Sequence, residues 1–156
     1  MQLLAAYLNA EYLPADPAGA PLRIGRRAAA LEARFPAAAH FALLTAWNPG
    51  SYPNDDAANL AAQHALDTAL AAAGLQFIPA LNRAPGGGHE EPSRLLLDAG
   101  DARVDALALR FGQAGALAWR RGRAVRLRIY RTEWRDPALI LRMDTRFIDW
   151  VACARP

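Results

Sequence analysis

The stretch Phe41-Ala42-Leu43-Leu44-Thr45-Ala46-Trp47-Asn48-Pro49-Gly50 decides the fold. Residues 41–47 are almost continuously apolar, which is typical of a strand whose two faces are both covered. Asn48-Pro49-Gly50 is a turn sequence and ends the strand. We therefore expect 41–47 to be a central strand of a sheet that helices cover.

A long helix is predicted over residues 55–73, directly after that turn. Asn54, Asp55 and Asp56 supply capping and first-turn acidic side chains, and Gly74 stands at the C′ position. A buried strand that is followed by a short turn and a helix is typical of α/β proteins.

Apolar alternation, caps and turn residues predict the other elements. We expect strands over 3–13, 22–25, 76–81, 93–98, 115–119 and 124–130, and helices over 26–34 and 101–110. The prediction is an α/β fold, on the border of α+β, with one mixed sheet of about six strands and two or three flanking helices. We expect the domain to span 1–130 and a C-terminal appendage, 131–156, to pack on it or on a partner. In that appendage, Asp136-Pro137 starts a short amphipathic helix and 147–151 is an apolar tail.

Length and composition predict a soluble, cytoplasmic protein. A chain of 156 residues buries enough surface to fold without a disulfide or metal, and Cys153 has no second cysteine to pair with, which favours a reducing compartment. Residues 1–8 lack the basic start of a secretory signal. The long Ala/Leu stretch 57–75 contains polar residues that a bilayer would exclude, so we expect no membrane contact.

The basic residues are all arginine, eighteen in number, with no lysine. We interpret this as the composition of a GC-rich bacterial genome, so arginine here is not evidence of selection for its forked geometry. Residues 1–118 carry a net charge of −3 and residues 119–156 a net charge of +6. The C-terminal part is therefore basic and the rest is mildly acidic.

Polar uncharged side chains concentrate at the junction between the predicted central strand and the long helix that follows it. Ligands of open α/β sheets usually lie at such junctions. We therefore predict a small-ligand or protein binding site built from Asn48, Ser51, Asn59, Gln63, Glu91, Ser93 and Gln113. The alternative is structural, because buried amides mostly satisfy turn and loop backbone groups. Asp55 and Asp56 already occupy the positive end of the helix, so a neutral polar or cationic ligand suits the site better than phosphate.

A second interpretation is an enzyme that hydrolyses a nucleotide-like substrate. His89-Glu90-Glu91 follows three glycines, so a mobile loop could close over Glu91 acting as general base. Neither the serines nor Cys153 has the context of a nucleophile. The three histidines show no metal-ligand spacing and no phosphate-binding glycine motif is present, so we expect neither a metal nor a cofactor.

The basic C-terminal part raises two further interpretations. Arg120, Arg121, Arg126 and Arg128, interleaved with aromatic residues, could follow a nucleic-acid backbone, although a solvated edge strand is the commoner explanation of such a pattern. The apolar tail 147–151 could instead form a homodimer contact.

Four motifs in this order resemble a bacterial family of unknown function, number 3293. They are residues 45–51, then Asn59 with Gln63 and Leu66, then 91–93, and then Phe111-Gly112-Gln113. The resemblance extends over about residues 4–130 and leaves out the tail. The family pattern often has arginine at the position of Ala62, and this chain departs from it there. The resemblance implies a cytoplasmic bacterial protein with one α/β domain, and no established activity.

Overall fold

A computed structural model describes residues 2–15, 20–135 and 144–152. The elements in this part of the chain, in order, are α1 (Gln2–Asn9), β1 (Glu11–Pro14), α2 (Ala29–Arg34), β2 (His40–Leu44), η1 (Pro49–Ser51), α3 (Asp56–Ala72), β3 (Gln76–Arg83), β4 (Glu91–Leu97), α4 (Asp101–Arg110), β5 (Gly115–Arg120), β6 (Arg126–Ile129), η2 (Thr132–Trp134) and β7 (Ile148–Trp150).

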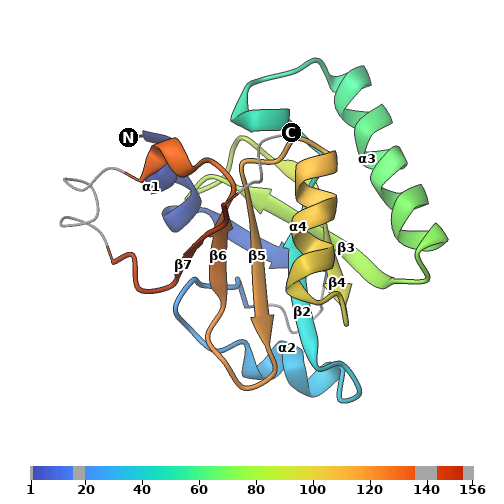
Figure 1. The fold of residues 1–156 in the computed structure, drawn as a ribbon, viewed down its shortest axis with the longest axis vertical. Helices are drawn as coiled ribbons and strands as arrows, with labels where there is room; N and C mark the ends of the chain where they lie inside the picture. Colours follow the sequence, from blue (N-terminus) through green and yellow to red (C-terminus); the bar gives the residue numbers. More distant parts are fainter. Residues whose placement is uncertain (1, 16–19, 136–143, 153–156) are drawn as a thin grey trace.

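The described strands form one mixed sheet in the order β1-β3-β4-β2-β5-β6-β7 (Figure 1). Every neighbouring pair is antiparallel except β6 and β7, which are parallel. The strand β2 lies in the middle, as its continuous apolar sequence predicts. The prediction of a mixed α/β sheet with flanking helices is confirmed, with seven strands in place of about six.

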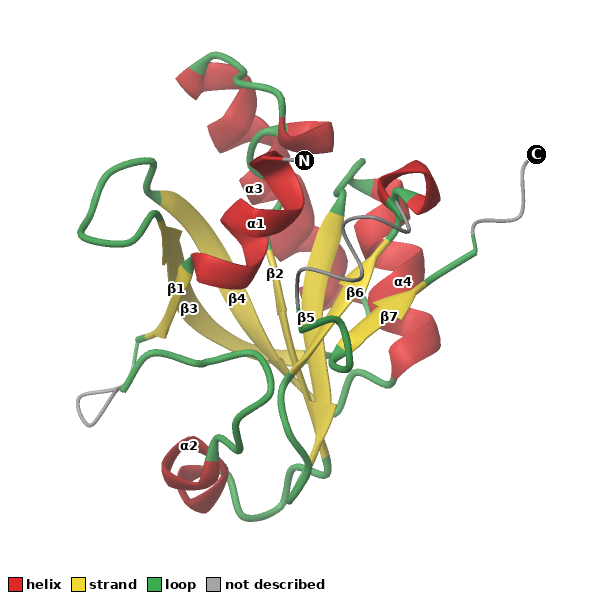
Figure 2. Cartoon of the chain, turned by 90° about the vertical axis from the view of Figure 1, so that its left-hand side faces the viewer, coloured by secondary structure: helices red, strands yellow, loops and turns green. Residues whose placement is uncertain are grey.

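Helices cover both faces of the sheet (Figure 2). Phe41 and Leu43 of β2 point to the face that α1 and α2 cover, where Leu4 and Leu31 join the same apolar cluster. Alternate residues of the central strands point to the α3 and α4 face, and they include the alanines Ala42, Ala116 and Ala118. Small side chains on a sheet allow a helix to pack closely against it. The chain thus has two apolar layers, one on each side of β2.

Paired charges anchor α3 and α4 to the sheet. The Arg94 guanidinium of β4 donates two hydrogen bonds to Asp67 of α3, at 2.7 and 2.6 Å. Arg128 of β6 likewise donates two, both of 2.7 Å, to Asp105 of α4. Bidentate pairs of this kind fix orientation as well as supplying energy. Each helix therefore has an apolar stripe toward the sheet and one ionic attachment point beside it.

The predicted strand over 3–13 is wrong in its first part. Residues 2–9 form α1, and only 11–14 form a strand. Residues 22–25 contribute an isolated bridge from Leu22 to Tyr12 in place of a strand. The helix 101–110 agrees with its prediction residue for residue, and Gly74 follows α3 with a φ of 65°.

The strand β7 comes from the predicted apolar tail. It pairs with β6 through the register Leu127 to Ile148, so this part of the tail extends the sheet. The short helix predicted from Asp136-Pro137 and the residue Cys153 lie outside the described residues. The boundary at residue 130 stays a prediction.

Candidate functional site

The candidate site lies where β2 ends. Because β4 runs antiparallel to β2, the end of β2 and the start of β4 lie side by side, with Leu44 paired to Arg94. The predicted strand continues to Trp47, but the ladder stops at Leu44. Beyond it the Thr45 hydroxyl donates to the Pro92 carbonyl at 2.7 Å. Side chains therefore replace the sheet's backbone bonds at this point.

Asn48 is the centre of a polar network. Its Nδ2 donates to Oε1 of Glu91 at 2.7 Å, and its backbone N–H donates to Oδ1 of Asn59 at 2.9 Å. Its Oδ1 accepts from Nδ2 of Asn59 at 3.0 Å and from the backbone N–H of Asn54 at 3.0 Å. One side chain thus joins the end of β2, the start of α3 and the start of β4.

Gln63 lies one helical turn beyond Asn59 on the same buried face of α3. Its Oε1 accepts the backbone N–H of Ala46 at 3.1 Å. Its Nε2 is buried and has no hydrogen-bond partner among the residues that the structure describes. A buried donor of this kind costs free energy unless something outside the protein pairs with it. We call Asn48, Asn59, Gln63 and Glu91 the polar junction.

Glu91 is the half-buried carboxylate of the polar junction. Burial raises its pKa above the usual value, and the hydrogen bond from Asn48 and the nearby His89 partly oppose this effect. Among the described residues only Asn48 forms a hydrogen bond with Glu91, through Oε1. The second oxygen, Oε2, is thus left for solvent or a ligand.

Two tyrosines border the polar junction, and the sequence did not single them out. The Tyr7 hydroxyl lies 2.9 Å from the Ser51 Oγ, and the Tyr12 hydroxyl donates to the Tyr7 carbonyl at 2.7 Å. Burial raises the pKa of Tyr7; the Ser51 bond and Arg131 lower it, whereas Glu91 raises it. The Tyr7 hydroxyl therefore lies within the fields of a carboxylate and a guanidinium. The spacing of Leu4, Tyr7 and Leu8 on one helical face was the signal available for this residue.

The remaining predicted site residues lie around the polar junction. Ser93 is fully buried and donates to Oδ1 of Asn82 at 3.0 Å. Gln113 donates from Nε2 to the Trp47 carbonyl at 3.1 Å, so it supports the loop that carries Asn48. The Ser51 side chain contacts Tyr7, and the Ser51 backbone N–H donates to the Asn48 carbonyl at 2.9 Å. Hydrogen bonds therefore join three of the seven residues directly, Asn48, Asn59 and Glu91, and the other four lie around them.

The backbone around the polar junction is strained. Asn48, Ser51 and His89 have positive φ values of 47°, 65° and 48°. Residues other than glycine rarely adopt this region, and they persist there where surrounding contacts hold them. The contacts of Asn48 described above are of that kind.

Two cavities bordered by described residues lie away from the polar junction. One of about 120 Å³ is bordered by Leu22, Arg23, Arg26 and residues 28–31. A more open one of about 590 Å³ lies between the end of α1 and Phe147. In the described residues no group of three or more His, Cys, Asp or Glu side chains is placed to hold a metal ion. None of the described helices is long and apolar enough to cross a membrane.

Three of the four arginines predicted for nucleic-acid binding make contacts within the chain. Arg121 donates to carbonyls at the end of α2, at 2.8 Å to Ala38. Arg126 pairs with Asp149 at 2.6 Å, and Arg128 with Asp105. Arg120 is exposed.

The fold and the site define an α/β protein with one mixed sheet and a polar network at the end of its central strand. Residues 44–116 match the model of the family described as Protein of unknown function (DUF3293). The match is narrower than the expected 4–130, but it contains all seven predicted binding residues. No curated protein and no solved structure matched the chain.

Proposed function

We propose that the chain binds a small polar molecule at the polar junction. The observation that carries the proposal is the half-buried Glu91 carboxylate, which Asn48 holds through Oε1 while Oε2 accepts no hydrogen bond from the described residues. A fixed, partly desolvated acceptor of this kind gives a ligand's N–H or O–H donor a defined position.

Two further observations support a ligand here. The buried Nε2 of Gln63 has no partner among the described residues, so one donor close to the Asn48 loop is left unsatisfied. The strained backbone of Asn48 and Ser51 is a common feature of binding sites. Asp55 and Asp56 at the start of α3 make the surroundings acidic, so the ligand we propose is neutral or cationic.

A thermal-shift screen with nucleosides, sugars and amino acids tests the proposal. A ligand at 100 times its Kd stabilises a protein by about 2.7 kcal/mol, which is roughly 5–10 °C for a chain of this size. Glu91→Gln should remove the shift because an amide replaces the free carboxylate oxygen. Glu90→Gln is the matched control, since Glu90 is exposed and has only a 4.0 Å contact with Arg83. A ligand whose shift survives in Glu91→Gln would place binding elsewhere.

The enzyme interpretation is the second candidate, and the raised pKa of Glu91 favours it. A carboxyl whose pKa moves toward neutrality is a better general base. We therefore propose that any hydrolysis of a nucleotide-like substrate uses Glu91 to activate water. The test is mass spectrometry of each screening hit after incubation with native chain and with Glu91→Gln. If the native chain leaves every hit chemically unaltered, the protein binds these molecules without hydrolysing them, and the enzyme interpretation is wrong.

We also propose a bacterial, cytoplasmic location. The single cysteine and the all-arginine basic composition support it. Fractionation of a bacterial host that carries the gene tests it, and recovery of the chain outside the cytoplasmic fraction would contradict it.

A further inference from the structure

A second surface, separate from the polar junction, lies at the opposite end of β2. The loop before α2 is joined there to the turn between β5 and β6. The Gly25 N–H donates to the Val125 carbonyl at 2.8 Å, and the Val125 N–H donates to the Arg26 carbonyl at 2.9 Å. Arg27 forms an isolated bridge with Ala124. The arginines of the loop and of the turn therefore belong to one surface.

Four arginines at this end of the sheet, from the loop, the turn and the last residue of β5, have guanidinium groups without an acidic partner among the described residues. We name them together the basic end: Arg26, Arg27, Arg120 and Arg123. All four are exposed. This contrasts with Arg94, Arg126 and Arg128, each of which has a carboxylate within 2.7 Å. The positive charge of these three arginines is thus neutralised, whereas that of the basic end is not.

Carboxylates near the basic end are already engaged: Asp144, which lines a cavity together with Arg26, pairs with Arg146 at 2.7 Å. Glu32 is buried and accepts from Nε1 of Trp119 at 3.2 Å and from the Gly122 N–H at 2.9 Å. Asp98 accepts from the N–H groups of Ala39 and His40. Glu32 and Asp98 stabilise the ends of α2 and β2, and within the described residues they form no ion pair with the basic end.

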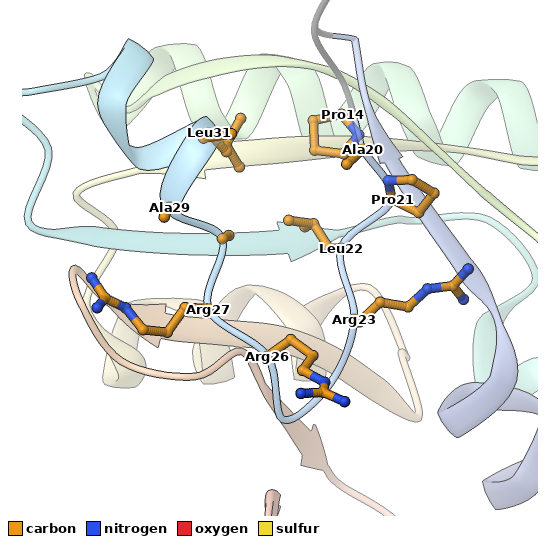
Figure 3. A pocket seen from close by; sticks show the side chains of 11 residues that line it. Pro14, Ala20, Pro21, Leu22, Arg23, Arg26, Arg27, Ala29 and Leu31 are labelled. Atoms are coloured by element: carbon orange, nitrogen blue, oxygen red, sulfur yellow. The ribbon is translucent and has the colours of Figure 1, made fainter.

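An apolar cavity opens beside the basic end. It has a volume of about 120 Å³ and is lined by Pro14, Pro21, Leu22 and Leu31 together with three arginines of the loop. Figure 3 shows that the side chains of Arg26 and Arg27 extend from the loop away from Leu31. The surface therefore combines guanidinium groups spread along a loop and a turn with an apolar wall next to them.

We propose that the basic end binds the phosphate backbone of a single-stranded nucleic acid. Arginines spread over two segments suit phosphates spaced along a strand better than one compact anion. A single strand also exposes its bases, which can lie against apolar surface, whereas a duplex hides them. This site uses arginines of a different group from the one that the sequence pattern suggested, with Arg120 common to both.

Fluorescence anisotropy with a labelled twenty-nucleotide oligo-dT tests the proposal on the full chain. The double variant Arg27→Gln/Arg123→Gln removes two phosphate contacts. It should weaken binding about 25-fold at 0.1 M salt and reduce the slope of log K against log salt by about 1.4. Arg103→Gln/Arg135→Gln is the matched control, because both side chains are exposed and the net charge changes equally. The control should bind as the native chain does.

Three results would overturn the proposal. The first is no binding of oligo-dT by the native chain at 50 mM salt. The second is an equal loss in the two double variants, which would show a nonspecific effect of net charge. The third is competition by poly-glutamate as effective as that by unlabelled oligo-dT, which would indicate an acidic polypeptide as the partner. Circular dichroism melts of both variants check that the fold is retained, and Arg27→Lys/Arg123→Lys should restore binding if one variant fails to fold.

Discussion

Replacing Asn59 by alanine should destabilise the chain more than any other single truncation in the polar junction. Asn59 is 1% exposed and makes three hydrogen bonds, to the Asn48 backbone N–H, to Asn48 Oδ1 and to the Asn54 carbonyl. Asn54 is exposed, so its carbonyl can bond to water after the substitution. The Asn48 Oδ1 keeps its bond from the Asn54 N–H, so the half-buried Asn48 backbone N–H is the group left unpaired, at a cost of about 1–3 kcal/mol. With the small void left behind, we expect a loss of about 2–4 kcal/mol.

Urea unfolding followed by tryptophan fluorescence measures this loss. The total stability of a domain is about 5–15 kcal/mol, so the effect should be visible as a clear fall in the midpoint. Asn54→Ala is the control, because the Asn54 Oδ1 accepts only an exposed bond from the Asp55 N–H, so the substitution should lose roughly 1 kcal/mol or less. Asn48→Ala combined with Asn59→Ala should cost less than the sum of the two, since they share bonds. A loss below about 1 kcal/mol for Asn59→Ala would refute the assigned network.

Three other predictions concern Glu91, the core and a strained turn. Because the pKa of Glu91 is raised in the folded chain, the folded chain keeps the carboxyl proton at a higher pH than the unfolded chain does. The free energy of unfolding should therefore rise as the pH falls through the folded-state pKa toward 4.5, the ordinary pKa of the carboxyl. Glu91→Gln should lack this contribution, as urea unfolding at pH 7 and pH 5 would show, and equal pH dependence in both chains would contradict it. Leu70→Ala removes a fully buried side chain of α3 and should cost about 2–5 kcal/mol by the same assay, against roughly 0.5 kcal/mol for the exposed Leu60→Ala. Gly112→Ala places a Cβ 3.2 Å from the Pro49 Cβ, whereas Gly74→Ala at the same φ of 65° meets nothing within 4 Å, so thermal melts should rank Gly112→Ala as the more damaging.

The sequence predicted the central layer of the fold because its signals there are local. The apolar run that begins at Phe41 needs no knowledge of neighbouring strands to indicate burial on both faces. The Asp55 cap is likewise local: its side chain accepts from the Ala58 N–H at 2.9 Å, as the pattern of α3 predicts. Periodicity and capping act within one helical turn, which explains why α3 and α4 agree with their predictions.

The N-terminal helix was missed because two signals in residues 2–14 compete. Leu4 and Tyr7 lie on one helical face, but the apolar run continues directly into the strand residues Tyr12 and Leu13 with no capping residue before it. A continuous apolar run of this length is compatible with a strand. The pairing of β1 with β3, which separates the two elements, joins residues about seventy positions apart and is not visible locally.

The polar junction was predicted from a rule for parallel sheets, and the antiparallel pairing of β2 with β4 changes how that rule applies. Ligand sites at strand ends are expected from parallel sheets, in which the carboxyl ends of strands share one edge. Here β4 is antiparallel to β2, so the start of β4 brings Glu91 to the end of β2. The contact between Asn48 and Asn59 could be predicted from their closeness in the sequence. The hydrogen bond from Asn48 to Glu91 could not, because it depends on the direction of β4 relative to β2.

The arginines show the same dependence on partners that are distant in the sequence. Arg126 and Arg128 form the basic face of a strand, and by pattern alone they are the natural choice for a phosphate contact. The sheet places that face over α4 and beside β7, where Asp105 and Asp149 neutralise it. Arg27 and Arg123 carry no such pattern, yet the chain brings them together where the available acids are already bonded. Uncompensated charge, and not the count of arginines, attracts a polyanion, so the ion pairs of the fold are the reason why we propose the basic end, and not the basic face of β6, as the binding surface.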